Sequence, residues 1–216
     1  MSSESVPLSG RRAEAVRNNT RILESARAVF VANPAAPISA VAEHAGVGIS
    51  ALYRRYPSKE DLLRTLCADG LKVYIEAVEA ALDDRGDPWA AFTTFMERIV
   101  AANSLALTVK LAGTFTPTEQ LWAESARGQT LNQQLVDRTK AAGVLREDID
   151  VNDLTFIFEQ LSAVRIGDEE RTRDLRKRYL ALFLQAMHAG TVGEAPSPLP
   201  GPAPTWQEVG ERWVPK

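Results

Sequence analysis

The sequence predicts an all-α protein of about nine helices, in which a compact head of three helices precedes a larger helical body. Apolar residues recur at helical spacing over most of the 216 residues, and the alternation typical of strands is nearly absent. Helix start and stop signals separate the apolar runs, with Asp-Pro or Thr-Pro before them and glycine or proline after them. The hydrophobic content of 45% and the charged content of 25% are those of an ordinary globular protein.

The head is expected to contain three helices joined by short breaks. They cover about residues 13–32, 38–45 and 49–56. Gly46 stands where the end of a helix favours a left-handed residue, and Pro57 ends the last of the three. Ser58, with Asp61 three residues later, then forms a variant of the capping box that opens a long helix.

The body is expected to contain five or six helices. They cover about residues 58–82, a stretch that begins at Asp87-Pro88, residues 116–142, a stretch that begins at Asp150, and residues 170–189. From Gly190 the composition changes to proline, glycine and serine, which predicts a flexible tail. The tail ends in TWQEVGERWVPK, whose two tryptophans could dock on the rest of the chain.

The helix, glycine turn and helix over residues 38–56 are typical of a helix-turn-helix DNA reader. At about 100° per residue, Leu52 and Tyr56 share the inward side of the second short helix. Ser50 and Arg54 then point outward. Small residues at the start of such a helix let its backbone approach base edges, and longer basic or phenolic side chains reach phosphates.

The charge distribution agrees with a polyanion partner for the head. Residues 1–64 hold nine basic and six acidic side chains, a net charge of +3, and the remaining residues hold 16 and 22, a net charge of −6. An imbalance of this size is weak evidence alone, and it favours nucleic acid only together with the helix-turn-helix pattern.

The stretch ISAVAEHAGVGISALYRRYPSKEDLL, with RILESARAVFVAN before it, resembles the DNA-binding domain of the tetracycline-repressor-like (TetR) transcription regulators. The resemblance covers about residues 17–66. It divides the chain into a flexible basic arm (1–16), a DNA-binding domain (17–66), a ligand-binding and dimerisation domain (67–189) and a Pro/Gly-rich tail (190–216). It implies a cytoplasmic homodimer that acts as a repressor on a palindromic operator and is released by a small molecule.

The resemblance also assigns DNA contacts by position. Ile49 and Ser50 fall where the family reads bases, although isoleucine can only touch a thymine methyl group. Phosphates or flanking bases are expected at Ala51, Tyr53, Arg54, Arg55 and Lys59. Ser39 lies near the start of the preceding helix, where a contact is often found, and Gly48 replaces the usual Ser or Thr cap.

Two further residue sets are expected in the body. The candidate ligand-binding residues are Trp89, Phe92, Thr93, Met96, Phe115 and Trp122. The candidate dimerisation residues are Leu154, Phe158, Leu161, Tyr179, Leu182 and Phe183. Few charges lie where they could pair with a buried charged ligand, so a neutral or weakly polar hydrophobic effector is favoured. The alternative for the aromatic set is plain core packing.

Other function classes have little support. No nucleophile–base set, paired carboxylates or phosphate-binding glycine loop stands out, so no enzyme activity and no cofactor are expected. Cys67 is the only cysteine and the chain has two histidines, so no metal site is expected, and a buried inert thiol is favoured over a redox sensor. No apolar run is long enough to span a membrane. A helical enzyme or a protein-interaction module that mimics the pattern remains the alternative, and salt-sensitive binding to duplex DNA distinguishes the two.

Overall fold

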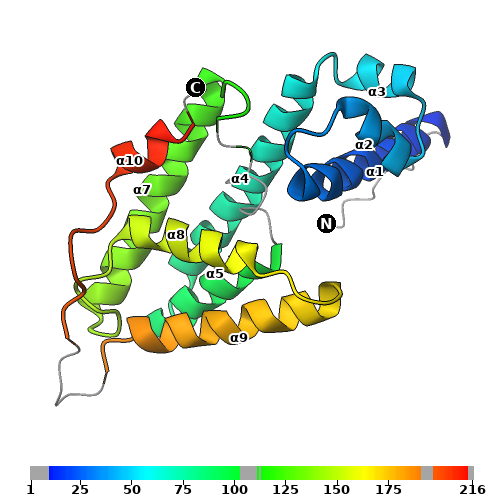
Figure 1. Cartoon of the computed structure of the whole chain (residues 1–216). Coiled ribbons are helices and arrows are strands. Elements are labelled where there is room, and N and C mark those ends of the chain that lie inside the picture. The colour runs from blue at the N-terminus through cyan, green and yellow to red at the C-terminus, as the bar shows by residue number, and fades with distance from the viewer. Residues whose placement is uncertain (1–9, 103–110, 112, 191–196, 214–216) are drawn as a thin grey trace, which may run out of the picture. The chain divides into compact units, whose positions relative to one another are not determined.

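The computed structural model describes residues 10–102, 111, 113–190 and 197–213, and nine helices lie in these ranges (Figure 1). This confirms the predicted all-α fold class. The chain divides into two compact units, one ending at Leu66 and the other beginning at Cys67. Each unit has its own hydrophobic core.

The first unit is built from three helices and the beginning of a fourth. They are α1 (Gly10–Ala32), α2 (Ile38–Ala45), α3 (Ile49–Arg55) and the first two turns of α4 (Lys59–Asp83). Each contributes a fully buried side chain, namely Phe30, Val41, Leu52 and Leu62. The core therefore fixes α2 and α3 against α1, and it leaves the opposite side of α3 exposed.

Helix α1 begins at Gly10, three residues before the expected start. Residues 10–16 are therefore helical, which differs from the flexible arm predicted for 1–16; residues 1–9 lie outside the described ranges. No glycine or proline interrupts residues 11–32, and arginine, alanine and glutamate are good helix formers, so the helix extends to this point.

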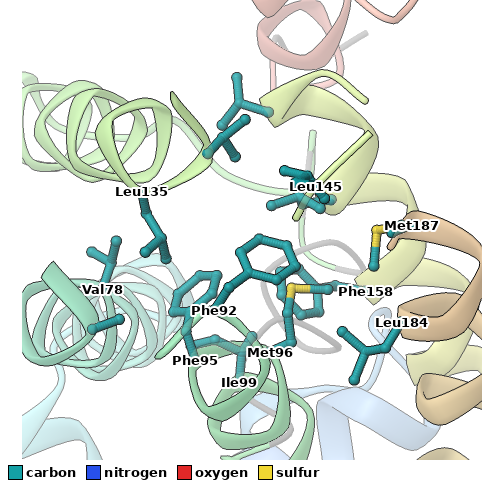
Figure 2. Packing of buried hydrophobic residues seen from close by; sticks show 14 of the residues in the cluster. Val78, Phe92, Phe95, Met96, Ile99, Leu135, Leu145, Phe158, Leu184 and Met187 are labelled. Carbon is teal, nitrogen blue, oxygen red and sulfur yellow. The ribbon is translucent and has the colours of Figure 1, made fainter. Parts of the chain in front are cut away.

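The second unit holds the rest of α4 and five further helices. They are α5 (Pro88–Ala102), α7 (Glu119–Ala141), α8 (Val151–Ala163), α9 (Glu169–Met187) and α10 (Trp206–Glu211). Figure 2 shows the centre of their core, where Phe92, Phe95 and Met96 of α5 meet side chains of α4, α7, α8 and α9. These three side chains are almost completely buried, so α5 is the central helix of the unit.

Several helix boundaries follow their predicted caps. Asp150 and Asp153 form a complete capping box at the start of α8. Helix α7 begins later than expected, because Thr118 rather than Thr116 is its N-cap and accepts a hydrogen bond from the Leu121 amide at 3.2 Å.

The C-terminal region contains a helix where a flexible tail was expected. Residues 206–211 form α10, which begins with a capping box between Thr205 and Glu208. The Thr-x-x-Glu pattern of this capping box is present in the sequence as TWQE. The surrounding prolines and glycines favoured an irregular tail instead.

None of the helices in the described residues combines the length and the apolar character that a membrane span requires.

Candidate functional site

A tight turn joins α2 to α3, and it depends on Gly46. This glycine has a φ of 63°, and its amide donates to the Glu43 carbonyl at 3.1 Å. A Cβ at this position would lie 3.2 Å from Nη2 of Arg21, which itself donates to the Ala45 carbonyl at 2.6 Å. Glycine satisfies both the left-handed conformation and the close approach of Arg21.

Helix α3 has the two faces that its sequence predicts. Leu52 and Tyr56 are buried in the core of the first unit. The exposed residues of α3 are Ile49, Ser50, Ala51, Tyr53, Arg54 and Arg55. Tyr53 and Ile49 are large side chains that are nevertheless exposed, at 46% and 40%. A surface of small residues followed by phenol and guanidinium groups suits a double-stranded DNA groove.

The end of α3 is held by α1. Asn19 Oδ1 accepts hydrogen bonds from Arg55 Nε at 3.0 Å and from the Tyr56 hydroxyl at 2.8 Å. Arg55 therefore has one donor committed within the protein, and its terminal nitrogens remain for a phosphate.

Lys59 is placed differently from the expectation. Its ammonium group donates to the carbonyls of Pro34 at 3.0 Å and Ala36 at 2.8 Å, and it lies 5.1 Å from the centre of the Phe30 ring. Burial also lowers the pKa of Lys59. Two of the three N–H donors thus hold the loop after α1, so the main role of Lys59 in this structure is structural.

Ser39 and Gly48 lie at the starts of the two short helices, Ser39 in the first turn of α2 and Gly48 directly before α3. Ser39 is exposed on the first turn of α2, as a contact residue would need to be. Gly48 is the N-cap of α3 with a φ of −64°, and a Cβ there would meet nothing within 4 Å. Unlike Gly46, Gly48 is not required by the backbone.

The second unit contains a partly open cavity of about 140 Å³. One water molecule needs about 10–15 Å³, so the space suits a ligand of about ten or more non-hydrogen atoms. Its walls come from α4, α7, α8 and the C-terminal region, and are formed by Cys67, Gly70, Leu71, Tyr74, Pro117, Leu121, Trp122, Ser125, Gly128, Gln129, Thr155, Phe158, Trp206, Val209, Arg212 and Trp213.

Of the six candidate ligand residues, only Trp122 lines this cavity. Phe92 and Met96 are packed in the core, so they have no free surface for a ligand, and Trp89 stacks on Phe92 with ring centres 5.6 Å apart. The Thr93 hydroxyl donates to its own helix, at the Ala90 carbonyl.

Phe115 is buried, and it contacts Trp213, which lines the cavity. Its ring meets the edge of Trp213, with ring centres 6.1 Å apart. In this structure Phe92 and Met96 are core residues, in keeping with the core-packing alternative for the aromatic set.

Small residues in two facing helices were the sequence signal for the cavity. Gly70 in α4 and Gly128 and Ser125 in α7 all line it. A glycine inside a helix costs about 1 kcal/mol relative to alanine, so two of them need a structural reason. A Cβ on Gly128 would stand in ordinary contact with Ile75, Leu71 and Tyr74, at 3.5–3.7 Å. Helix α7 therefore passes close to α4 at this point, although an alanine would also fit.

The cavity surface is mostly apolar. Burial raises the pKa of the Cys67 thiol to about 12 and also raises the pKa of Tyr74, so both groups are neutral at physiological pH. Gln129 donates to Asn152 Oδ1 at 3.0 Å, which satisfies part of its amide. In the described part of the chain, no three His, Cys, Asp or Glu side chains converge as a metal site would require.

The expected dimerisation residues separate into two groups. Leu154, Phe158 and Leu161 of α8 are buried in the core of their own chain, so they cannot present side chains to a second copy. On α9, Leu182 is 53% exposed, Tyr179 is also exposed, and Phe183 is partly buried. Only the α9 set has surface available for a partner.

Two family models match the chain. The model described as "Bacterial regulatory proteins, tetR family" matches residues 22–66, the unit that holds the helix-turn-helix. The model described as "Transcriptional regulator SbtR-like, C-terminal domain" matches residues 87–191. One match therefore lies in each structural unit. No curated protein matches the chain.

Solved structures of regulators share the fold. A TetR transcriptional regulator from Streptomyces coelicolor is 24% identical, with 78% of this chain and 97% of that one covered and a TM-score of 0.54. LfrR from Mycobacterium smegmatis, solved with proflavine, is 21% identical over 78% and 96%, with a TM-score of 0.60.

The ketosteroid transcriptional regulator KstR2 of Mycobacterium tuberculosis is 16% identical over 81% of this chain and 96% of that one, with a TM-score of 0.61. At these identities the likeness concerns the fold, and the family models supply the assignment. With both of its units matched, the chain belongs to the tetR family of bacterial regulatory proteins and is a DNA-binding transcriptional regulator.

Proposed function

We propose that this regulator is a homodimeric repressor that binds a palindromic operator through α3 and releases it when a small apolar effector enters the cavity of the second unit. The observation that supports operator binding most directly is the exposed face of α3, where Ser50, Tyr53 and Arg54 lie opposite the buried Leu52. Ser39 and Arg55 border that face.

The face assigns different roles to different residues. Tyr53 and Arg54 have the reach and the donors for phosphate contacts, which position a protein on DNA without reading sequence. Ser50 lies near the start of α3, where side chains approach base edges and can hydrogen-bond to them. Ile49, beside it, offers an apolar contact to a thymine methyl group.

Duplex binding over a series of salt concentrations tests these roles. Tyr53→Ala and Arg54→Ala should weaken binding to every sequence, and loss of the Arg54 charge should reduce the salt slope by about 1. Ser50→Ala should instead change which operator sequences are selected from a random pool. The control is Arg85→Ala, which removes an exposed arginine in a loop of the second unit.

Equal affinity and salt slope for wild type, Tyr53→Ala and Arg54→Ala would reject the assigned face. It would favour a helical protein without DNA-reading activity at α3.

The cavity supports an apolar effector without net charge. Its wall is built mainly from aromatic and aliphatic side chains, and Arg212, the charged residue among those that line it, is paired with Glu159 at 2.8 Å. A charged ligand would lose its hydration without a free partner, which is costly. One structural relative is named as a ketosteroid regulator, which suggests uncharged polycyclic compounds as the first class to test.

A screen of such compounds by tryptophan fluorescence, followed by operator release, tests the effector site. Ser125→Leu places a bulky side chain in the cavity and should abolish both responses while operator binding persists. Ala123→Leu adds the same side chain on the exposed face of α7 and should leave both unchanged. Effector binding that survives Ser125→Leu would place the effector elsewhere.

The dimer contact is proposed on the outer face of α9. Tyr179, Leu182 and Ala186 recur at helical spacing on this face, and all three are exposed in the single chain. A self-complementary contact between two such stripes gives the twofold symmetry that a palindromic operator needs.

A further inference from the structure

We infer that the C-terminal segment, residues 197–213, forms one wall of the effector site and contacts the effector. We also infer that Trp206 and Trp213 help to determine which effectors bind. The inference rests on the effector role proposed above for the cavity. It assigns the segment a ligand of definite chemistry, a planar aromatic or polycyclic molecule that the two indole rings can cover.

The cavity is incomplete without this segment. Helices α4, α7 and α8 supply the walls on the body, and Trp206, Val209, Arg212 and Trp213 supply the wall from the C-terminal segment. In Figure 1, α10 runs beside α7, as the shared cavity lining requires.

Two large apolar side chains on this cavity keep much of their surface uncovered. Trp122 of α7 is 37% exposed and Trp206 of α10 is 38% exposed. Indole rings usually bury most of their surface, and stacking on a planar ligand adds about 0.5–1.5 kcal/mol beyond the burial of area. Rings from two elements that border one space therefore indicate a site for a flat molecule.

A specific set of contacts docks the end of the segment. Arg212 forms two parallel hydrogen bonds with the Glu159 carboxylate, both 2.8 Å long, and its guanidinium lies 5.5 Å from the centre of the Phe156 ring. The bidentate pair has well-defined geometry and is only partly exposed, so it specifies the orientation of α10. Trp213 completes the contact against Phe115.

A second anchor lies at the start of the segment. Arg146 donates to the Ser197 carbonyl at 2.8 Å, and the Leu199 amide donates to Asp148 at 2.8 Å. Arg146 and Asp148 are themselves joined by two hydrogen bonds of 2.9 and 2.7 Å. The segment is thus fixed at both ends. Its cavity-lining residues lie between these anchors and at the one formed by Arg212.

The docked wall and the ligand should stabilise one another. Helix α10 has only six residues, and helices this short are unstable alone, so it depends on its docking contacts. If docking raises effector affinity by some factor, the effector must raise the docking equilibrium by the same factor. The segment then becomes more ordered when the cavity is filled.

The experiment uses the full chain and the neutral polycyclic dye Nile red as the probe. Trp206→Ala and Trp213→Ala should each weaken Nile red binding about tenfold, through lost stacking and lost buried area. The matched control is Gln207→Ala, which changes an exposed residue of α10 outside the cavity wall. It should bind the dye like wild type.

Substitutions in the Glu159–Arg212 docking pair supply a second readout. Glu159→Gln should increase hydrogen exchange at residues 206–213 and weaken Nile red binding, and the dye should slow exchange at the same residues in wild type. The double variant Glu159→Arg with Arg212→Glu should restore part of both effects, because the pair is rebuilt in reverse. Such rescue would not follow from general damage to the fold.

The outcomes separate this inference from the proposed function. If Trp122→Ala and Ser125→Leu alter Nile red binding while the Trp206 and Trp213 variants bind normally, the effector site stands and the C-terminal wall is overturned. If none of these variants alters binding, the effector site itself is wrong and the inference fails with it.

Discussion

A single side-chain oxygen of α1 holds the C-terminal end of α3: Asn19 Oδ1 accepts from both Arg55 Nε and the Tyr56 hydroxyl. The two donors approach at 3.0 and 2.8 Å and lie 36 and 37 residues away in the chain. Because Tyr56 is buried and Arg55 is exposed, the bond pair connects the core of the first unit to its outer face.

Removing this acceptor should affect both stability and DNA binding. Asn19→Ala removes the part-buried hydrogen bond from the Tyr56 hydroxyl to Asn19 Oδ1, which should lower the free energy of unfolding by about 1 kcal/mol. Operator affinity should fall as well, since the end of α3 loses its support. Asn19→Asp keeps an acceptor and should retain stability better. Asn18→Ala is the neighbouring control, and equal denaturation midpoints for Asn18→Ala and Asn19→Ala would contradict the role of Asn19.

The two glycines of the turn should respond oppositely to the same substitution. Gly46→Ser puts a side chain on a residue with a φ of 63° and should destabilise the protein by about 1–2 kcal/mol. Gly48→Ser occupies open space with an ordinary φ and adds a capping oxygen, so it should stabilise by a few tenths to about 1 kcal/mol. Thermal unfolding of both variants checks this, and a loss of stability in Gly48→Ser would count against the described cap.

Lys59→Met tests whether this lysine supports the fold. Methionine keeps most of the length but removes the donors that bind the carbonyls of Pro34 and Ala36, which should cost about 1–3 kcal/mol of stability. Lys72→Met is the control, since the Lys72 side chain is 77% exposed. Unchanged stability together with weaker DNA binding would return Lys59 to the phosphate role expected from the sequence.

The proposed dimer contact gives a prediction for α9. Leu182→Glu buries a carboxylate in the contact and should shift the protein to monomers in sedimentation at micromolar concentration. Ala181→Glu introduces the same side chain at an exposed position outside the stripe and should leave the dimer intact. Monomers for wild type, or dimers for both variants, would exclude this face.

The anchor that Arg146 and Asp148 form at the start of the C-terminal segment should withstand moderate acid. Hydrogen bonds from Arg146 and from the Leu199 amide hold the pKa of Asp148 well below its usual range. A group whose pKa is lowered on folding stabilises the fold above its unfolded pKa, about 3.9, and the contribution is lost as pH falls through the folded value. Hydrogen exchange at residues 197–213 should therefore be protected equally, after correction for intrinsic rates, from pH 8 down to about 4.

Asp148→Asn should weaken that protection throughout the range, because the charge that pairs with Arg146 is removed. If protection in wild type declined between pH 7 and 5, another titrating group would govern the docking.

The sequence by itself determined the head of this protein. Its signals are local: a glycine that supplies the left-handed turn at position 46, apolar residues four apart at Leu52 and Tyr56, and a cap at Ser58. Local signals of this kind act within one or two helical turns, so the face of α3 follows from helical geometry alone.

Tertiary packing decided what the body does with its aromatic residues. Phe92 and Phe158 look alike in the sequence, yet one is enclosed in the core and the other also borders the cavity, because only the relative placement of α4, α5, α7 and α8 distinguishes them. The docking of Arg212 on Glu159, 53 residues away, depends in the same way on contacts between distant parts of the chain. Helical periodicity identifies an apolar stripe, whereas the side chains that cover it come from elements that no short stretch of sequence contains.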